Sequence, residues 1–325
     1  MIQVSIIIPH YNRTEILGRT LKSVLDQTHT NWEVIIVDDK SEFNEYQKLL
    51  SVTNDKRIRV IQNSTDLKGP SICRNIGASE ANGKYLLFLD SDDLLAPFCL
   101  EQRIREMEAN PAIKLGIFLM QEFEVEPSDA KGYYNLTDIL PNYFVNSFLQ
   151  NKNPWQTMAP LWEKDFFNAI GGFDEELFYM EDPELHVRAL LKDSTCIETF
   201  YHLPADCYYR INYHDDSKAD FYENSIRYRI LFFEKVCHLL LQKNLFIKYK
   251  KDIQNGLMKL FRSFMIYRIN LYPDYYKAFI QLISKYNIFP LYKLSLIYLT
   301  VLTWRSTNNL VKVLKLRGLT YRMLS

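Results

Sequence analysis

Tyr85-Leu86-Leu87-Phe88-Leu89-Asp90-Ser91-Asp92-Asp93 is the stretch that decides the fold of this chain. It opens with successive apolar or aromatic residues, a pattern typical of a strand buried on both faces of a parallel sheet. The acids that follow then lie at the carboxyl end of the strand, where open α/β sheets bind their ligands. Because neighbouring carboxylates repel each other, we expect a cation among them, and Mg²⁺ or Mn²⁺ commonly joins protein acids to substrate phosphates. The other interpretation is that Asp90-Ser91-Asp92 only begins a helix near Pro97.

Strands and helices alternate around this stretch. Apolar runs predict buried strands at residues 4–9, 33–39, 58–61 and 85–89, and helical spacing of apolar residues predicts helices at 14–27, with Thr14 as its cap, and at 71–81. This alternation with short connections indicates an α/β fold with a doubly wound, mostly parallel sheet. The segment after the first strand, His10-Tyr11-Asn12-Arg13, contains no glycine, which disfavours a dinucleotide-binding enzyme.

A second strand also ends in acids, at Asp38-Asp39. Carboxyl ends of parallel strands meet at one edge of a sheet, so we expect both acidic ends to face one ligand pocket. The carboxylate of Asp39 can accept hydrogen bonds from the N–H of a nucleobase or from ribose hydroxyls. The other interpretation is that Asp38, Asp39 and Ser41 form a capped turn.

The composition describes an ordinary folded chain whose charges are divided unevenly. Its 325 residues, 47% hydrophobic and 24% charged, allow one large domain plus an appended one. The five cysteines show no paired spacing, so we expect neither disulfides nor a zinc site and favour the cytoplasm. The amino terminus lacks the basic start of a signal peptide. Residues 218–325 carry 19 Lys and Arg against 5 Asp and Glu, whereas residues 1–217 carry 20 against 34.

Four motifs follow one another in the body of the chain. Residues 4–12 end in Pro9-His10-Tyr11-Asn12, residues 27–41 end in Asp38-Asp39-Lys40-Ser41, Arg74-Asn75-Ile76-Gly77 leads to the acids at 90–93, and Gly171-Gly172-Phe173-Asp174 precedes Glu181-Asp182. In this order they resemble the family-two glycosyltransferases, which have the GT-A fold, over about residues 1–217. His10 and the Glu42-Phe43 that follows Ser41 depart from the usual pattern. The Gln-x-x-Arg-Trp motif of processive synthases is absent, which favours transfer of a single sugar.

The resemblance implies an inverting enzyme that uses a nucleotide-diphosphate sugar, usually a UDP-sugar. The donor would be bound by Pro9, Tyr11, Asp39, Arg74, Asp90 and Ser91. A divalent cation, Mn²⁺ or Mg²⁺, would be ligated by Asp92 and His214, and it would neutralise the charge of the diphosphate leaving group. Two alternatives stay open, because Arg74 could be an arginine on a helix surface and His214 a solvated loop residue.

On the acceptor side the resemblance implies that Asp182 is the base that takes the proton from the attacking hydroxyl. Gly171, Gly172, Asp174, Glu181 and Trp155 would lie beside it, with Thr157 near the donor sugar. Each has another interpretation: acids at a helix start favour the helix dipole, paired glycines can end a helix, and Trp155 can belong to the core.

The sequence suggests a domain boundary near residue 217. We expect a catalytic domain at 1–217, with a nucleotide-sugar half at about 1–95 and an acceptor half at about 96–217, and a basic helical region at 218–325. Its helices are separated near Asn244, Pro273 and Pro290. The uncharged run of residues 294–304 is too short to span a bilayer. This region either binds an anionic membrane, which would place the protein on the inner face of the cell membrane, or packs on the catalytic domain. No nucleic-acid motif accompanies its charges.

Two other functions remain to be separated from the glycosyltransferase. A sugar nucleotidyltransferase should have a glycine-rich phosphate loop after the first strand, and the sequence has none there. A non-catalytic binding protein of this fold, for a membrane or another partner, has no need of Asp39, Asp90, Asp92, Asp182 and His214 together. The expected partners are therefore a nucleotide-sugar donor and a saccharide or lipid-linked saccharide acceptor, with no nucleic acid.

Overall fold

The computed structural model describes residues 3–211, 218–268 and 270–305, which form two compact units. The first unit consists of the described residues within 1–141 and 153–215. The second consists of residues 142–152 and the described residues from 218 onward. The helical unit therefore takes in a short segment from within the range expected for the catalytic domain.

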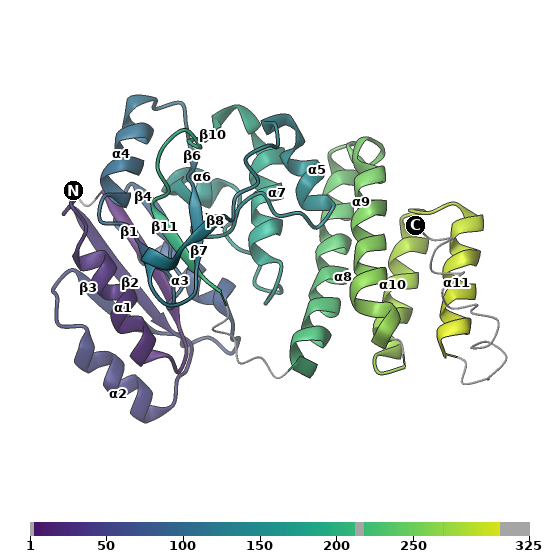
Figure 1. Cartoon of the computed structure of the whole chain (residues 1–325), viewed down its shortest axis with the longest axis horizontal. Coiled ribbons are helices and arrows are strands. Elements are labelled where there is room, and N and C mark those ends of the chain that lie inside the picture. The colour runs from purple at the N-terminus through teal and green to yellow at the C-terminus, as the bar shows by residue number, and fades with distance from the viewer. Residues whose placement is uncertain (1–2, 212–217, 269, 306–325) are drawn as a thin grey trace. The chain divides into compact units, whose positions relative to one another are not determined.

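The first unit is built on a mostly parallel sheet (Figure 1). Its strands are β1 (Val4–His10), β2 (Trp32–Asp38), β3 (Ile58–Gln62), β4 (Tyr85–Phe88), β6 (Leu115–Ile117), β9 (Pro160–Glu163) and β10 (Ile197–Thr199). They lie in the order β10-β6-β9-β4-β1-β2-β3, and β9 runs antiparallel to both of its neighbours. The strands β1, β2 and β4 are almost wholly buried, because helices cover the sheet on both faces. The predicted α/β class and all four predicted strands are confirmed.

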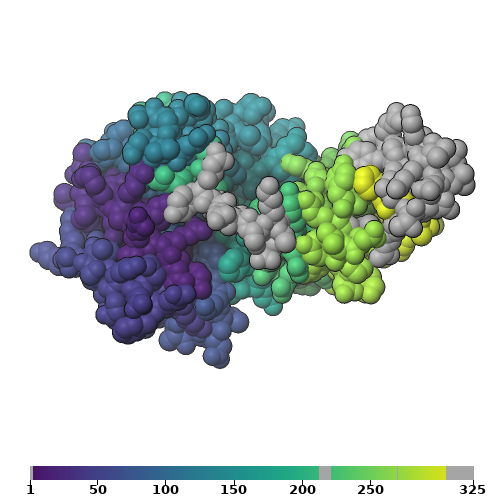
Figure 2. All heavy atoms as spheres, turned by 60° about the horizontal axis from the view of Figure 1, so that its bottom comes forward, coloured from purple at the N-terminus to yellow at the C-terminus, as the bar shows by residue number. Residues whose placement is uncertain are grey.

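Helices of the first unit follow the strands in the expected alternation. They are α1 (Thr14–Leu25), α2 (Phe43–Val52), α3 (Pro70–Glu80), α4 (Cys99–Ala109), α6 (Lys164–Ala169) and α7 (Glu181–Lys192), with short 3₁₀ turns at Pro127–Asp129 and Ser194–Cys196. A further 3₁₀ turn, Pro141–Tyr143, lies where the chain passes into the second unit. The purple and blue atoms of the first elements form one continuous block in Figure 2. Thr14 is not the cap of α1: Arg13 holds that position without a side-chain cap, and the hydroxyl of Thr14 donates to the carbonyl of Glu45 at 3.2 Å.

The acids at 90–92 do not begin a helix. The short strand β5 (Leu94–Leu95) follows them, and α4 begins only at Cys99. β5 belongs to a second sheet, in the order β5-β11-β7-β8, with β7 (Met120–Phe123), β8 (Lys131–Tyr133) and β11 (Cys207–Arg210). This sheet was not predicted, because its strands are short and come from distant parts of the sequence. The interpretation of Asp90-Ser91-Asp92 as a helix start is therefore wrong.

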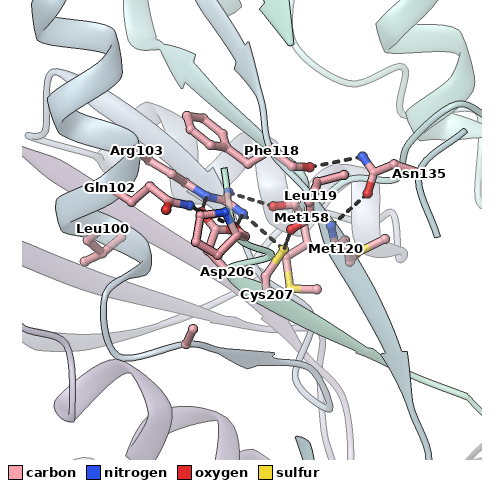
Figure 3. A network of polar contacts seen from close by, with 12 residues as sticks. Leu100, Gln102, Arg103, Phe118, Leu119, Met120, Asn135, Met158, Asp206 and Cys207 are labelled. Carbon is pink, nitrogen blue, oxygen red and sulfur yellow. Dashed lines mark hydrogen bonds and ion pairs between the residues drawn. The ribbon is translucent and has the colours of Figure 1, made fainter. Parts of the chain in front are cut away.

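A buried ion pair ties α4 to the second sheet (Figure 3). Arg103 donates through Nε to Asp206 Oδ2 at 2.9 Å and through a terminal nitrogen to Oδ1 at 2.6 Å, and neither side chain is exposed. The guanidinium also donates to the carbonyl of Met158 at 2.9 Å, and Gln102 donates to Asp206 at 3.2 Å. The amide of Ala96 in turn donates to the carbonyl of Asp206, so β5 is held in the same place. Burying both charges is tolerated because each is hydrogen-bonded at several positions.

The second unit is helical. It contains α5 (Phe144–Leu149), α8 (Lys218–Gln242), α9 (Phe246–Leu260), a π-helical turn (Phe261–Met265), a 3₁₀ turn (Ile266–Arg268), α10 (Pro273–Lys285) and α11 (Leu291–Arg305). The expected separations near Asn244, Pro273 and Pro290 are confirmed, and Asn244 has φ of 57°. Gly256 is required where α9 meets α5, since a Cβ there would lie 2.0 Å from the carbonyl oxygen of Leu149. None of the described helices is long and apolar enough to cross a membrane.

Replacing Asp206 with alanine should destabilise the first unit strongly. The substitution leaves the buried guanidinium of Arg103 without its anion, and breaking such a pair costs about 3–5 kcal/mol. Urea unfolding measures the loss. The matched control is Lys22→Ala, which breaks an exposed pair of Lys22 with Asp26 and should cost less than about 1 kcal/mol. Equal stability losses in the two variants would contradict the importance of the buried pair.

Candidate active site

The site lies where β1, β2 and β4 end. These adjacent strands are parallel, so their carboxyl ends share one edge, and the strand order reverses beside β1. Pro9 is a partly buried residue of β1, opposite Val37. Tyr11 is half exposed just beyond the strand, and Nζ of Lys68 lies 4.8 Å from the centre of its ring. The edge therefore presents an aromatic face next to the acids.

Asp39 is held with its carboxylate in a fixed orientation. Asn63 Nδ2 donates to Oδ1 at 2.8 Å, and the backbone N–H of Gly69 donates to Oδ2 at 2.8 Å. Gly69 precedes α3 with φ of 133°, a conformation that favours glycine. Each carboxylate oxygen has a further lone pair, so Asp39 can still accept from a ligand N–H.

Asp38 turns away from this edge. It is fully buried, its Oδ1 lies 2.9 Å from His10 Nδ1, and its Oδ2 accepts from the backbone N–H of Ser41 at 3.1 Å. Burial alone would raise the pKa of Asp38, but the hydrogen bonds from His10 and Ser41 lower it below its usual value. The capped-turn interpretation is thus right for Asp38 and Ser41, and the expectation that Asp38 faces the ligand pocket is wrong. The unusual His10 is the partner of this inward carboxylate.

Arg74 joins two parts of the site. Its buried guanidinium donates to Asp90 Oδ1 at 2.6 Å and to Glu181 Oε1 at 3.0 Å. It also lies 5.2 Å from the centre of the Phe173 ring. The interpretation of Arg74 as a surface arginine is therefore wrong. Through Arg74 the end of β4 is connected to the first residue of α7.

The acids after β4 form a crowded group. Burial, and then the negative charges of Asp92 and Asp90, raise the pKa of Asp93 well above its ordinary value. Asp93 is buried and accepts from the backbone N–H of Arg210 at 2.8 Å. Asp92 accepts from the guanidinium of Arg13 at 3.2 Å, and Asp90 is the more exposed carboxylate. Ser91 is buried, and its carbonyl accepts from the hydroxyl of Thr20.

The chemistry of this group fits a hard cation. Carboxylate oxygens are the ligands that Mg²⁺ and Mn²⁺ prefer, and mutual repulsion of the acids favours a cation there. Within the described ranges, no three His, Cys, Asp or Glu side chains form a group that could hold a metal ion by themselves. Mg²⁺ is commonly held by one or two carboxylates together with substrate phosphates. His214, the other expected ligand, lies outside the described residues.

Asp182 stands in the first turn of α7, near the cluster around Arg74. Burial, and then the charge of Glu181, raise the pKa of Asp182 well above its ordinary value, while Arg74 opposes the shift and Asp90 adds to it. The pKa of Glu181 is raised in the same way by burial, against the effect of Arg74. A carboxylate with a raised pKa is a stronger base, so the environment suits Asp182 to accept a proton.

Tyr134 and Tyr209, which were not predicted from the sequence, also lie near the acids of the site. Burial, and then the charge of Asp182, raise the pKa of Tyr134 to about 12. Burial, and then the charge of Asp93, raise the pKa of Tyr209 above its usual value. The two rings lie 5.8 Å apart between their centres. Tyr209 belongs to β11 and Tyr134 follows β8, so only knowledge of the second sheet would have found them.

The remaining acceptor-side candidates, Gly171, Gly172 and Asp174, make local backbone contacts, and their place beside an acceptor stays a prediction. Gly171 and Gly172 have φ of 88° and 66° and end α6, and their N–H groups donate to the carbonyls of Asn168 and Phe167. This is the pattern of a Schellman cap, as the helix-end interpretation allowed. Asp174 Oδ1 accepts from the N–H of Glu176 at 3.0 Å.

Trp155 is fully buried, and its ring lies 5.5 Å from that of His186 between ring centres with the two planes tilted, so the core interpretation describes it. Thr157 is also buried. These two side chains are therefore part of the packed interior.

Comparison with known proteins identifies a family whose members resemble this chain. Residues 5–162 match the family model described as glycosyl transferase family 2. An Escherichia coli relative named UDP-Glc:alpha-D-GlcNAc-diphosphoundecaprenol beta-1,3-glucosyltransferase WfgD is 39% identical over 33% of this chain and 42% of its own length. TuaG of Bacillus subtilis, named a putative teichuronic acid biosynthesis glycosyltransferase, is 38% identical over 32% of this chain and 41% of its own length.

The fold is also found in solved structures. The crystal structure of S. aureus TarS 1–349 in complex with UDP-GlcNAc has a TM-score of 0.63 and 20% identity, and the match covers 99% of this chain and 90% of that one. At this identity the likeness shows the fold, which is GT-A. The chain spans less than two thirds of the length of its curated relatives, from 18% to 63% in four uncharacterized glycosyltransferases of Rickettsia and Haemophilus influenzae.

Replacing Arg74 with methionine should make stability fall as the pH rises. Without the guanidinium, the carboxyl pKa values of Glu181 and Asp182 rise further in the folded state, so the folded state binds protons more tightly than the unfolded state does. A raised carboxyl pKa gives stability that is lost as the pH increases. We expect the deficit relative to the parent to be larger at about pH 8 than at about pH 5, measured by urea unfolding. Arg105→Met, which removes an exposed arginine of α4, is the control, and a deficit independent of pH would contradict the role of Arg74.

Proposed function

Residues 5–162 of the chain belong to glycosyl transferase family 2, and we propose that the protein is an inverting glycosyltransferase that moves one sugar at a time. The donor is a nucleotide-diphosphate sugar, and the acceptor is a hydroxyl of a saccharide or a glycolipid. The observation that carries this proposal is the bridge made by Arg74, which connects Asp90 at the end of β4 with the start of α7, where Asp182 lies. A donor-side acid and a base candidate thus belong to one connected cluster.

The nucleotide is proposed to be uridine diphosphate. The oriented carboxylate of Asp39 would accept from the imide N–H of uracil, and the exposed ring of Tyr11, bordered by Pro9, would lie against the base. WfgD is named for a UDP-sugar donor, and the TarS neighbour is in complex with UDP-GlcNAc, which supports this choice. Asp90, Ser91 and Arg74 would adjoin the ribose and the diphosphate.

A divalent cation would be held by Asp92, together with His214 and the oxygens of the diphosphate. Bound there, Mn²⁺ or Mg²⁺ supplies Lewis-acid stabilisation of the charge that develops on the departing diphosphate. The guanidinium of Arg13 pairs with Asp92. Because the side chain of Arg13 is partly exposed, this guanidinium would move aside when the metal ion binds Asp92.

Asp182 is proposed to act as the base. The acceptor oxygen forms its bond to the anomeric carbon from the face opposite the diphosphate, while its proton passes to the carboxylate of Asp182. The bond between the anomeric carbon and the diphosphate oxygen breaks, and its electron pair leaves with UDP. A single displacement of this kind inverts the configuration at the anomeric carbon.

The acceptor is proposed to be an intermediate of surface polysaccharide or glycan assembly. WfgD is named for an acceptor on diphosphoundecaprenol and TuaG for teichuronic acid biosynthesis, which supports a saccharide that is lipid-linked. We propose a catalytic domain within residues 1–217, with its nucleotide-sugar half at about 1–95 and its acceptor half at about 96–217. Residues 142–152 of that range fold with the helical region of residues 218–325. The protein would then work in the cytoplasm, at the inner face of the cell membrane.

The surface of α11 supports contact with a membrane. Leu291, Tyr292, Leu299 and Leu302 are 82%, 74%, 48% and 65% exposed, and α11 contains no acid. No Asp or Glu follows Asp274 in the sequence, whereas eight Lys and Arg do. Exposed apolar side chains among cations suit the interface of an anionic bilayer. Among the cations of α9, Lys259 donates to the carbonyl of Asn151, so it is already engaged.

Incubation with a panel of UDP-sugars tests the function. Mass spectrometry should detect UDP release with Mn²⁺ or Mg²⁺ present, and excess chelator should abolish it. Full activity in excess chelator would exclude the proposed metal. Release of pyrophosphate on incubation with UTP and a sugar phosphate would indicate a nucleotidyltransferase instead, and absence of any turnover would favour a binding protein.

Asp182→Asn should separate chemistry from binding. Loss of the base should lower transfer about 10²–10⁴-fold, because asparagine keeps the shape but accepts no proton. The affinity for UDP with metal, measured by calorimetry, should stay within about twofold, as expected when only a transition-state interaction is lost. Asp165→Asn, at an exposed position in the first turn of α6, is the control. Transfer within about threefold of the parent would exclude Asp182 as the base.

Leu291→Glu combined with Leu302→Glu should weaken attachment to membranes. Charged side chains at these exposed positions oppose burial in an anionic interface, so sedimentation with phosphatidylglycerol vesicles at low salt should fall about threefold or more. Leu241→Glu changes an exposed leucine of α8 and serves as the control. If all three proteins bind the vesicles equally, α11 has no part in attachment.

A further inference from the structure

One face of α3 is polar, although it is directed at the protein and not at solvent. Ser71, Arg74 and Asn75 are spaced by three and four residues and so lie on the same side of the helix. Ser71 and Asn75 bond the segment 173–180, which leads into α7, and Arg74 bonds Glu181, the first residue of α7. The hydroxyl of Ser71 donates to the carbonyl of Leu177 at 2.7 Å, and Arg74 donates to Glu181.

Asn75 makes the most specific of these contacts. Its Oδ1 accepts from the N–H of Phe173 at 2.9 Å, and its Nδ2 donates to the carbonyl of the same residue at 2.9 Å. The amide therefore pairs with one backbone residue as a neighbouring strand would. It also donates to Glu175 at 2.9 Å. A Cβ on Gly172 would lie 2.7 Å from Asn75 Oδ1, so the glycine leaves room for this pairing.

The start of α3 also contacts the donor side. The N–H of Gly69, directly before the helix, orients the carboxylate of Asp39. A Cβ on Gly69 would also lie 3.0 Å from the ring of Phe178, which belongs to the held segment. The helix and the glycine before it thus contact Asp39, which would bind the uracil, and the segment that leads to Asp182, which would take the proton.

The held segment is also anchored by buried side chains: Phe173 and Leu177 are buried, and the ring of Phe173 lies 5.0 Å from that of Phe88 between ring centres. Between Phe173 and Met180 it contains no helix or strand, and Met180 enters α7 with φ of 67°. Asp182 follows two residues later, within the first turn of α7. The position of this first turn therefore depends in part on where α3 holds the segment.

We propose that Asn75 and Ser71 are positioning residues, which hold the segment 173–180 against α3 and so set the place of Asp182 relative to a donor bound at Asp39 and Asp90. The inference rests on the proposed function of Asp182 as a base. Ser71 and Asn75 would act in transfer and not in binding the nucleotide. Their side-chain hydrogen bonds given above all reach the segment 173–180.

Asn75→Ala and Ser71→Ala test the proposal in the full chain. For Asn75→Ala, kcat should fall about tenfold or more, with UDP affinity and the KM for donor within about twofold, because misplacing a catalytic group by about 1 Å costs about a hundredfold. The acid limb of the pH–kcat profile should move, since it reports the group that must lose its proton. Ser79→Ala is the matched control, because Ser79 is exposed on the same helix and bonds only within it at Ile76. Values of kcat and a pH profile equal to those of the control would overturn the proposal.

Gly172→Ala supplies a second route should Asn75→Ala fold poorly. The added methyl group would push against Asn75 Oδ1, so it should reproduce the loss of kcat. Part of that loss comes from backbone strain at φ of 66°, which is the same in both backgrounds. The loss should therefore be smaller in the Asn75→Ala background, a coupling that measures the shared contact. Strict additivity would overturn the contact as the cause.

Hydrogen exchange separates this inference from the proposed function. Exchange of the Phe173 amide and of residues 174–181 should quicken about tenfold or more in Asn75→Ala, whether or not a donor is turned over. If the parent transfers sugar and Asp182→Asn does not, unchanged kcat in Asn75→Ala defeats the positioning role alone. If Asp182→Asn retains transfer, the assigned base fails, whereas faster exchange in Asn75→Ala still supports the hold on the segment. Unchanged exchange overturns that hold.

Discussion

The guanidinium of Arg74 is the constraint on which the site depends. It is buried between Asp90 and Glu181, which come from different parts of the chain, and it holds the end of β4 near the start of α7. A planar fork can donate in two directions at fixed separation, which a lysine ammonium cannot do in the same way. The carboxylates nearby would repel each other without it, and Asp182 owes its raised pKa to burial and to Glu181 against the opposing charge of Arg74. The basicity proposed for Asp182 is thus a balance between one cation and several acids.

The sequence predicted this arrangement only in part, for physical reasons that particular residues illustrate. The strands β1, β2 and β4 were predictable because each is an uninterrupted apolar run, and burial on both faces requires such runs. The directions of the Asp38 and Asp39 side chains were not predictable. Adjacent residues of an extended strand point to opposite sides, and the partners that fix each side, His10, Asn63 and Gly69, are far apart in sequence. Tyr134 and Tyr209 were not predicted as site residues for a similar reason. The second sheet joins short strands whose pairing no local sequence pattern encodes. His214 lies outside the described residues, so its expected role as a ligand stays a prediction.

The uneven charge of the chain follows the division into units. The first unit carries the carboxylates of the site. In the described helices of the second unit, most of the charged residues are Lys or Arg. The helical unit is not merely an extension of the chain, because residues 142–152 from within the body supply α5, which Asp252 of α9 holds through Asn146 and Gln150. A boundary drawn from sequence at residue 217 separates the two compositions but not the two folded units. Composition reports where charges are, while compactness depends on contacts between distant segments.

His10 shows how a departure from a family pattern can be absorbed without loss of the site. An imidazole at the end of β1 is buried, and a buried polar ring needs partners. Asp38 and Thr14 lie at 2.9 Å and 3.3 Å from its nitrogens, and Asp38 in turn accepts from Ser41. The pair uses up the carboxylate that points inward, so the carboxylate of Asp39 alone is left facing the edge of the sheet. An acid pair in the sequence is therefore divided by the fold into one structural group and one group that can accept from a ligand, and His10 is a partner of the structural group.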